Sequence, residues 1–191
     1  KRVVGFCLLD APRSDVWIAA TDPHAAYSGG LLKETRLVED ASGGVWYQHL
    51  KLPWPVQDRH WLIRIRRNAD LAAKSEGLIW EHAWSLDEKG EPFVAEFIKS
   101  GHIADVSLEV AQKSIYTPVN HGAWITIALP EDRTLLVYHV TSVVGGSIPD
   151  SFVAEWSMLT LEKLLREVGD YARGIPAHYV GDHPIFLGAD G

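Results

Sequence analysis

The sequence lacks the residues and patterns that several protein classes require. It contains one cysteine, Cys7, which excludes an internal disulfide and favours a reducing compartment. No apolar run approaches the ~20 residues that a membrane-spanning helix needs. The net charge is −7, so the chain has no excess of basic residues for general nucleic-acid binding. We therefore expect a globular cytoplasmic protein that does not bind nucleic acid.

Motifs for metal binding and nucleophilic catalysis are also missing. The nine histidines form no His-x-x-x-His pair and no His/Cys cluster, so we expect neither a metal nor a cofactor. Glu81 and His82 are neighbours on an expected strand, so they face opposite ways and form no dyad. The string Gly145-Gly146-Ser147 precedes a helix but lacks a Walker lysine and GxGxxG spacing. We interpret it as a sharp turn.

The 191 residues, 47% of them apolar, fit one domain. Alternating and β-branched segments predict strands over 3–9, 31–39, 45–52, 60–67, 78–86, 115–129 and 134–144. Helical spacing predicts short helices over 12–20, 68–76, 92–99 and 103–113, and a long helix from Pro149 to about Arg173. Adjacent strands joined by tight turns predict an antiparallel sheet that buries the stripe of the long helix. We expect a domain over 1–174 and an irregular tail over 175–191.

Strand alternation divides the side chains between two faces of this sheet. One face is aromatic and carries few charges, and the long helix offers it an apolar stripe. Residues 123–129 are apolar on both faces of their predicted strand, and we assign Trp124 from this strand to the aromatic face. Tyr47, His49 and Lys51 fall on the opposite face, which we expect to be solvated. The predicted ligand-binding residues are Trp46, Gln48, Leu50, Trp61, Ile63, Ile65, Trp80, His82, Trp84, Trp124, Val153, Trp156, Ser157, Thr160 and Leu164.

A helix that lies across a curved antiparallel sheet leaves an apolar hollow between them. The tryptophans either fill this hollow or line it. If they fill it, the protein is an interaction domain with a packed core. If they line it, aromatic walls suit a flat polycyclic ligand, or a choline headgroup through cation–π contact. His82 and Gln48 would then hold a polar group of the ligand.

Three stretches together resemble the START-type lipid-transfer domains, the family related to the steroidogenic acute regulatory protein. They are Val3–Asp15 (VVGFCLLDAPRSD), Lys51–Arg59 (KLPWPVQDR) and Tyr138–Pro149 (YHVTSVVGGSIP). They occur in the family's order, within residues 3–173. The resemblance implies an α+β helix-grip fold, in which a curved antiparallel β-sheet wraps around a long C-terminal α-helix and one hydrophobic molecule lies between them.

The resemblance also assigns a role to Pro53-Trp54-Pro55. Neither proline can donate to a strand ladder, so the three residues form a rigid corner that sets the mouth of the pocket. Asp58 and Arg59 are expected to anchor this corner through charge-assisted hydrogen bonds. The family's Arg-Asp pair is Arg59-His60 here, with the acid moved to Asp58. The family's N-terminal helix and strand do not precede the first strand, so we expect them to lie outside this sequence.

Residues 88–114 are longer and more helical than the corresponding connection of the family, and we expect this helical insertion near the cavity mouth. Two interpretations remain open for 91–103. The segment is an amphipathic helix packed on the sheet, or it is a lid. In the second case Phe93, Phe97 and Ile98 cover the cavity and touch a membrane during ligand exchange.

These observations favour a monomeric binding module that sequesters or transfers one lipid or sterol-like molecule, with transient membrane contact and without chemistry. The alternative is an enzyme, because helix-grip relatives include polyketide aromatase/cyclases. Such an enzyme needs an acid–base group in the cavity. His82 is the best candidate, with Tyr138 behind it.

Overall fold

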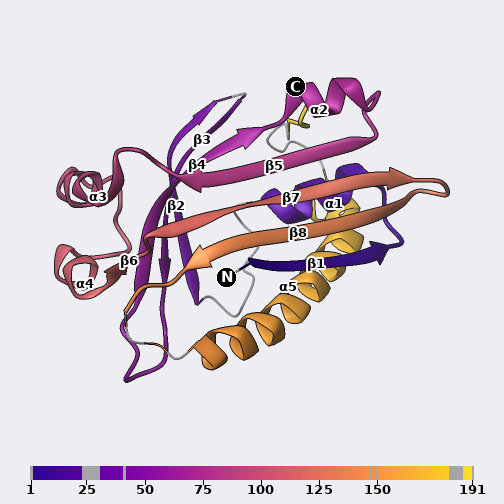
Figure 1. Cartoon of the computed structure of the whole chain (residues 1–191). Helices are drawn as coiled ribbons and strands as arrows, with labels where there is room; N and C mark the ends of the chain where they lie inside the picture. The colour runs from indigo at the N-terminus through magenta and orange to yellow at the C-terminus, as the bar shows by residue number, and fades with distance from the viewer. Residues whose placement is uncertain are drawn as a thin grey trace.

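An antiparallel sheet and a long C-terminal helix dominate the computed structural model (Figure 1). The structure describes residues 2–22, 31–40, 42–146, 148, 150–180 and 187–190; within the last helix it describes side chains from Thr160 onward. The strands are β1 (Arg2–Leu9), β2 (Leu32–Asp40), β3 (Gly43–Leu50), β4 (Arg59–Arg67), β5 (Ile79–Leu86), β6 (Ile115–Tyr116), β7 (Val119–Leu129) and β8 (Arg133–Val143).

The strands form one sheet in the order β1-β8-β7-β5-β4-β3-β2. Neighbours along this path are antiparallel, and the short β6 pairs in parallel with β4. The first strand therefore lies beside the last one, which the order of the elements along the chain does not reveal.

Two helices cover one face of the sheet, here called the inner face. They are α1 (Arg13–Thr21) and α5 (Asp150–His178), whose apolar side chains form one core with Leu9, Trp124 and Leu136. Helix α5 crosses close to β1 because position 5 is a glycine. A Cβ atom at Gly5 would lie 2.7 Å from a methyl carbon of Leu161. The predicted helix-grip arrangement is confirmed.

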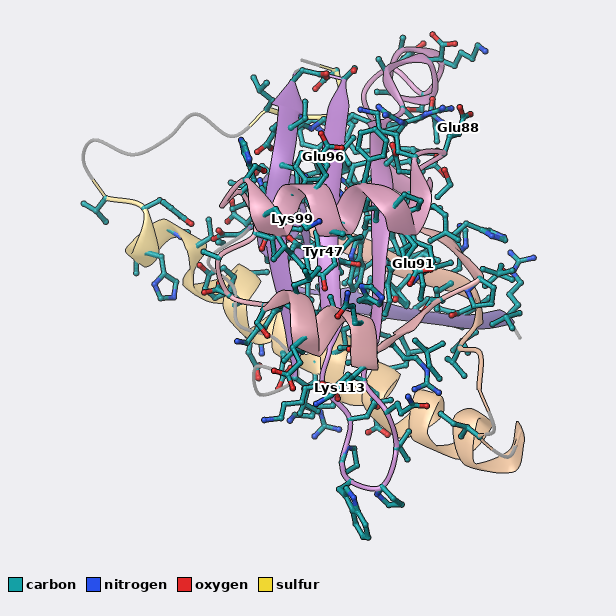
Figure 2. The ribbon with its side chains drawn as sticks, turned by 90° about the vertical axis from the view of Figure 1, so that its left-hand side faces the viewer. Tyr47, Glu88, Glu91, Glu96, Lys99 and Lys113 are labelled. Atoms are coloured by element: carbon teal, nitrogen blue, oxygen red, sulfur yellow. The ribbon has the colours of Figure 1, made fainter. Side chains whose placement is uncertain are left out.

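Two other helices cover the opposite, outer face of β3 and β4. They are α3 (Gly90–Lys99) and α4 (Leu108–Lys113), and Figure 2 shows them lying across the strands with Tyr47 between them. Their apolar residues pack against Val45, Tyr47 and Leu62. Because of this cover, Tyr47 and His49 are buried, and the prediction that their face is solvated was wrong.

The end of α5 extends past the predicted limit. It runs to His178 and includes Pro176, because tertiary contacts hold its last turns. Ile175 is buried, and the hydroxyls of Tyr171 and Tyr179 both donate to Asp22 at the end of α1. The remaining short helix, α2 (Ala69–Lys74), follows β4. No helix within the described residues is long and apolar enough to span a membrane.

The region predicted to be an irregular tail also contributes to the core. Ala189 is buried against Trp17 and Trp80. The indole N–H of Trp17 donates to the carbonyl oxygen of Leu187 at 3.0 Å. These residues of the tail are therefore part of the domain.

Candidate ligand-binding site

The inner face brings together the predicted site residues of the sheet. Residues directly opposite one another on antiparallel strands share a face. The register pairs Trp46 with Ile63, Gln48 with Trp61, Ile65 with Trp84, and His82 with Trp124. Leu50 and Trp80 follow by alternation on β3 and β5. The structure thus places all ten predicted strand residues on one side of the sheet.

These residues form two packed groups that meet at one tryptophan. Trp46, Trp61, Ile63 and Ile65 pack together at the β3–β4 end of the inner face. Trp124 packs instead with the residues of α1 and α5. Trp84 contacts both groups, so the aromatic surface is continuous from β3 to β8.

The helix contributes fewer described side chains. Leu164 packs against the α1–α5 core, and Thr160 is half-buried. The side chains of Val153, Trp156 and Ser157 lie outside the described residues. Their part in the site stays a prediction.

His82 is the deeply buried titratable group among the predicted residues of the inner face. It is buried, and its ring lies 5.4 Å from that of Trp46 and 5.9 Å from that of Trp17. Burial lowers the pKa of His82 to about 3, and the positive charges of Arg67 and Arg36 act in the same direction. The imidazole is therefore neutral at physiological pH.

Gln48, the other predicted polar contact, is engaged by the protein itself. Its Oε1 accepts from the indole N–H of Trp61 at 2.7 Å, and its Nε2 donates to Glu34 at 2.5 Å. This chain of hydrogen bonds fixes the Trp61 ring. His82 is thus better placed than Gln48 to meet a ligand.

Several buried polar atoms of the inner face have no hydrogen-bond partner within the described part of the chain. They are Nε1 of Trp46, Nε1 of Trp80, Nδ1 of His82, Oγ1 of Thr126 and Nε of Arg36, which stands opposite Trp46 on β2. Buried polar groups are nearly always hydrogen-bonded in native proteins, and an exception calls for an explanation. A bound molecule or ordered water would supply the missing partners.

The Pro53-Trp54-Pro55 corner is anchored as expected. Asp58 Oδ1 accepts from the Leu52 amide at 2.9 Å. The buried Arg59 guanidinium donates to the carbonyl oxygens of Val144 and Gly145, at 2.7 and 2.9 Å. Arg59 therefore joins the corner to the turn that leads into α5.

The predicted lid residues lie elsewhere. Phe93, Phe97 and Ile98 pack on the outer face with Tyr47 and Leu62. An amphipathic helix needs an apolar surface for its stripe, and the outer side of β3 and β4 provides one. The lid hypothesis is therefore wrong, and the packed-helix interpretation holds. The insertion does reach the corner, where Gln57 Nε2 donates to the carbonyl of Lys113 at 3.0 Å.

One cluster has the composition of a hydrolase triad but not its geometry. His49 Nε2 lies 3.3 Å from Ser114 Oγ and 3.4 Å from Asp58 Oδ2. In a triad the acid and the nucleophile contact different ring nitrogens, whereas both contact the same one here. Ser114 Oγ also donates to the Val110 carbonyl at 2.8 Å. The cluster tethers α4 to β3.

The described residues contain no group of three His, Cys, Asp or Glu side chains that could hold a metal. This finding covers the described ranges alone.

Three residues near the site were not predicted. Trp17 on α1 contacts the rings of both Trp80 and His82, at 5.4 and 5.9 Å. Arg36 lies over the ring of Trp46 at 4.2 Å. Thr126, which faces Trp80 across the β5–β7 pair, is fully buried. Thr126 could have been found, since it follows Trp124 by two positions on one strand.

Comparison with known proteins identifies the fold. No family model and no curated protein sequence matches the chain. Among solved structures, human STARD10 has a TM-score of 0.66 at 11% identity, over 93% of this chain and 65% of that one. A STAR-related lipid transfer protein from Xanthomonas axonopodis has a TM-score of 0.66 at 16% identity, over 90% of this chain and 85% of that one.

An enzyme also appears among the similar structures. The Zhui aromatase/cyclase from Streptomyces sp. R1128 has a TM-score of 0.56 at 16% identity, over 91% of this chain and 94% of that one. The chain spans less than two thirds of the STARD10 chain. At these identities the likeness concerns the fold, and it shows that this chain has the helix-grip fold of START-type lipid-transfer domains.

Proposed function

We propose that the protein binds one hydrophobic small molecule, a lipid or sterol-like compound, between the inner face and α5, and sequesters or transfers it. The observation that carries this proposal is a continuous aromatic face that holds five buried polar atoms without a hydrogen-bond partner among the described residues. Burial of ligand surface at ~25 cal/mol/Å² supplies the affinity. The few polar atoms supply the specificity. The fold shared with lipid-transfer proteins supports the same function.

Native mass spectrometry of freshly purified protein, followed by organic extraction, tests this function. We expect a stoichiometric hydrophobic adduct, or uptake of one molecule from a mixed lipid and sterol extract. A ligand-free mass without uptake from that extract would contradict the proposal and would favour a filled core.

We also propose that transient membrane contact occurs through the Pro53-Trp54-Pro55 corner. Trp54 is 92% exposed, the largest exposed fraction among the described large apolar side chains. An exposed tryptophan on a rigid loop suits the membrane interface, where an amphipathic ring is stable. Arg59 joins this corner to the turn that precedes α5, so the corner lies at one end of the inner face.

The substitution Trp54→Ala tests the membrane contact. We expect slower ligand transfer between vesicles and weaker vesicle binding. We expect no change in thermal stability, because the side chain is almost fully exposed. Trp54→Phe should restore part of the vesicle binding. Unchanged vesicle binding by Trp54→Ala would place the membrane contact elsewhere.

The second candidate is an enzyme of the aromatase/cyclase type. One observation favours it: His82 and Tyr138 both lie on the inner face, where the register places Trp124 between them. Their pKa values oppose it, since burial lowers that of His82 to about 3 and raises that of Tyr138 to about 12. Efficient acid–base catalysis needs a pKa near the working pH. We therefore favour the binding function.

The variant His82→Ala separates the two candidates. Loss of turnover of a poly-β-ketone substrate by a folded variant would support the enzyme. Weaker retention of a copurified ligand, without any turnover by the unmodified protein, would support the binding module. Circular dichroism confirms that the variant is folded in either case.

A further inference from the structure

The tryptophans of the inner face and α1 differ in what their indole N–H groups bind. Three of them have an acceptor within the chain. Trp17 donates to the Leu187 carbonyl, Trp61 to Gln48, and Trp84 to Asn120 Oδ1 at 2.9 Å. Nε1 of Trp46 and Nε1 of Trp80 are buried without an acceptor among the described residues. An indole N–H can only donate, so these two groups can be satisfied solely by an acceptor from outside the described chain.

The unpaired groups fall into two neighbouring positions. Trp46 and His82 have ring centroids 5.4 Å apart, and Nδ1 of His82 also lacks a partner. Trp80 and Thr126 stand directly opposite each other on β5 and β7. Trp17 contacts both His82 and Trp80, so the two positions adjoin along one face.

The surrounding charges distinguish between possible ligand headgroups. The Arg36 guanidinium lies 4.2 Å from the Trp46 ring centroid, and that of Arg13 lies 3.5 Å from the Trp80 ring centroid. One face of each ring is thus already covered by a protein cation. A quaternary ammonium group binds through aromatic ring faces, so it would find one face of each ring already taken. The charge of Arg36 is itself offset by an ion pair with Glu39 at 3.0 Å, so the unpaired indole N–H groups, which meet an acceptor oxygen directly, decide the preference.

We propose that the ligand carries an acceptor oxygen, in a carboxylate or a ketone, that binds the indole N–H of Trp46 beside His82, and that the site rejects quaternary ammonium headgroups. Trp80 and Thr126 mark a second polar position for ligands with another oxygen. This inference deepens the proposed binding function and rests on it.

Three probes with alkyl chains of similar length test the inference. They are palmitic acid, 2-heptadecanone and hexadecyltrimethylammonium, each titrated below its micelle concentration and followed by native mass spectrometry. We expect the acid or the ketone to bind at least tenfold more tightly than the ammonium compound. Comparable or tighter binding of the ammonium compound would overturn the inference but would leave hydrophobic binding intact. No binding of any probe, together with a ligand-free native mass, would instead remove the proposed function.

Substitution of single indole groups locates the contact. Trp46→Phe removes the free N–H and should weaken binding of the preferred probe by about tenfold, the value of one hydrogen bond. Trp84→Phe removes the same ring atoms together with an N–H that is already bound to Asn120, so its effect on ligand binding includes no lost hydrogen bond to the ligand. Equal losses for the two variants would overturn the assignment of Trp46. Thermal melting verifies that both variants are folded.

Discussion

Strands β3 and β4 bury both of their faces, but they do so in different ways. On the outer face, α3 and α4 close over Tyr47 and Leu62 with aliphatic and phenylalanine side chains of the same chain. On the inner face, the buried side chains are mainly tryptophan and isoleucine. Among the described side chains of β3 and β4, each face keeps one unpaired buried polar atom, Nε1 of Trp46 on the inner face and Nε2 of His60 on the outer face. The inner face continues onto β5 and β7, where atoms of Trp80, His82 and Thr126 are also unpaired.

This difference teaches how to tell a core from a binding surface when both are buried. A face that the chain closes for itself is filled by side chains selected for mutual fit. A face that binds another molecule keeps buried polar groups whose hydrogen bonds only the bound molecule can supply. The comparison can be tested with pairs of variants that change the two faces in the same way.

The largest expected effect comes from a pair of adjacent residues, Leu62 and Ile63. Leu62 is fully buried on the outer face and Ile63 is 2% exposed on the inner face. We expect Leu62→Ala to lower the free energy of unfolding by about 3 kcal/mol, in the range for buried leucines. The proposed binding function predicts that Ile63→Ala costs clearly less in the ligand-free protein, because a bound molecule would then form part of the surroundings of Ile63. Urea unfolding of ligand-free protein measures both.

The same pair should behave differently when ligand is present. Ile63→Ala should weaken ligand binding, whereas Leu62→Ala should leave the binding of the folded fraction unaltered. If the two substitutions cost the same in stability, the inner face is a packed core like the outer one. That outcome would remove the structural basis of the proposed function.

The next largest effect is expected where the two regions meet. Arg59 is the first residue of β4, whose later residues alternate between the inner and the outer face. It is buried and donates to the carbonyls of Val144 and Gly145 before α5. Arg59→Met should lower the free energy of unfolding by about 2 kcal/mol, because it leaves buried carbonyl oxygens without donors. Arg59→Lys keeps the charge but not the fork of donors, so it should recover only part of the loss. Full recovery by lysine would show that charge alone matters at the corner.

Much of the inner face could be predicted from the sequence, because strand alternation is a local signal. The alternation of Trp46, Gln48 and Leu50 against Tyr47 and His49 assigned each residue to its face. The packing of α3 and α4 on the outer face could not be predicted, because no local sequence signal tells which face of the sheet a later helix covers. The apolar stripe of α3 fits either side of a sheet, and the packing against Leu62 is a long-range contact.

The unpaired donors could not be predicted either. All the tryptophans look alike in the sequence, and only tertiary contacts separate Trp84, which donates to Asn120, from Trp46, which has no acceptor in the described part of the chain. The positions of Arg36 and Trp17 depend in the same way on pairings between distant segments. The sequence thus predicts which residues form the surface, whereas the structure is needed to say what that surface lacks.

A third prediction concerns pH and involves one histidine on each face. Burial lowers the pKa of His82 to about 3 and that of His60 to about 4. Between these values and about 6.5, the unfolded chain binds protons that the folded chain does not, so stability falls as the pH falls. Each histidine contributes a slope of about 1.4 kcal/mol per pH unit in that range, and none above it.

Urea unfolding between pH 5 and 7.5 measures this slope. His82→Asn and His60→Asn should each reduce this slope by about 1.4 kcal/mol per pH unit, the contribution of one proton. The two variants should differ in ligand binding, since only His82 lies on the inner face. If His82→Asn left the slope unaltered, the imidazole would be accessible to protons in the folded state, and the site would be wetter than proposed.

The smallest expected effect is the difference in free energy of unfolding between Trp46→Phe and Trp84→Phe in the ligand-free protein. Both substitutions remove the same pyrrole ring atoms, so their packing losses nearly cancel in the comparison. Trp84→Phe also breaks the hydrogen bond to Asn120 and leaves that buried oxygen unpaired, whereas Trp46→Phe removes a donor that had no partner. We therefore expect Trp84→Phe to be less stable than Trp46→Phe by about 1 kcal/mol. If Trp46→Phe were the less stable variant, its N–H would have a partner in the ligand-free protein, and the inner face would be satisfied in the same way as the outer face.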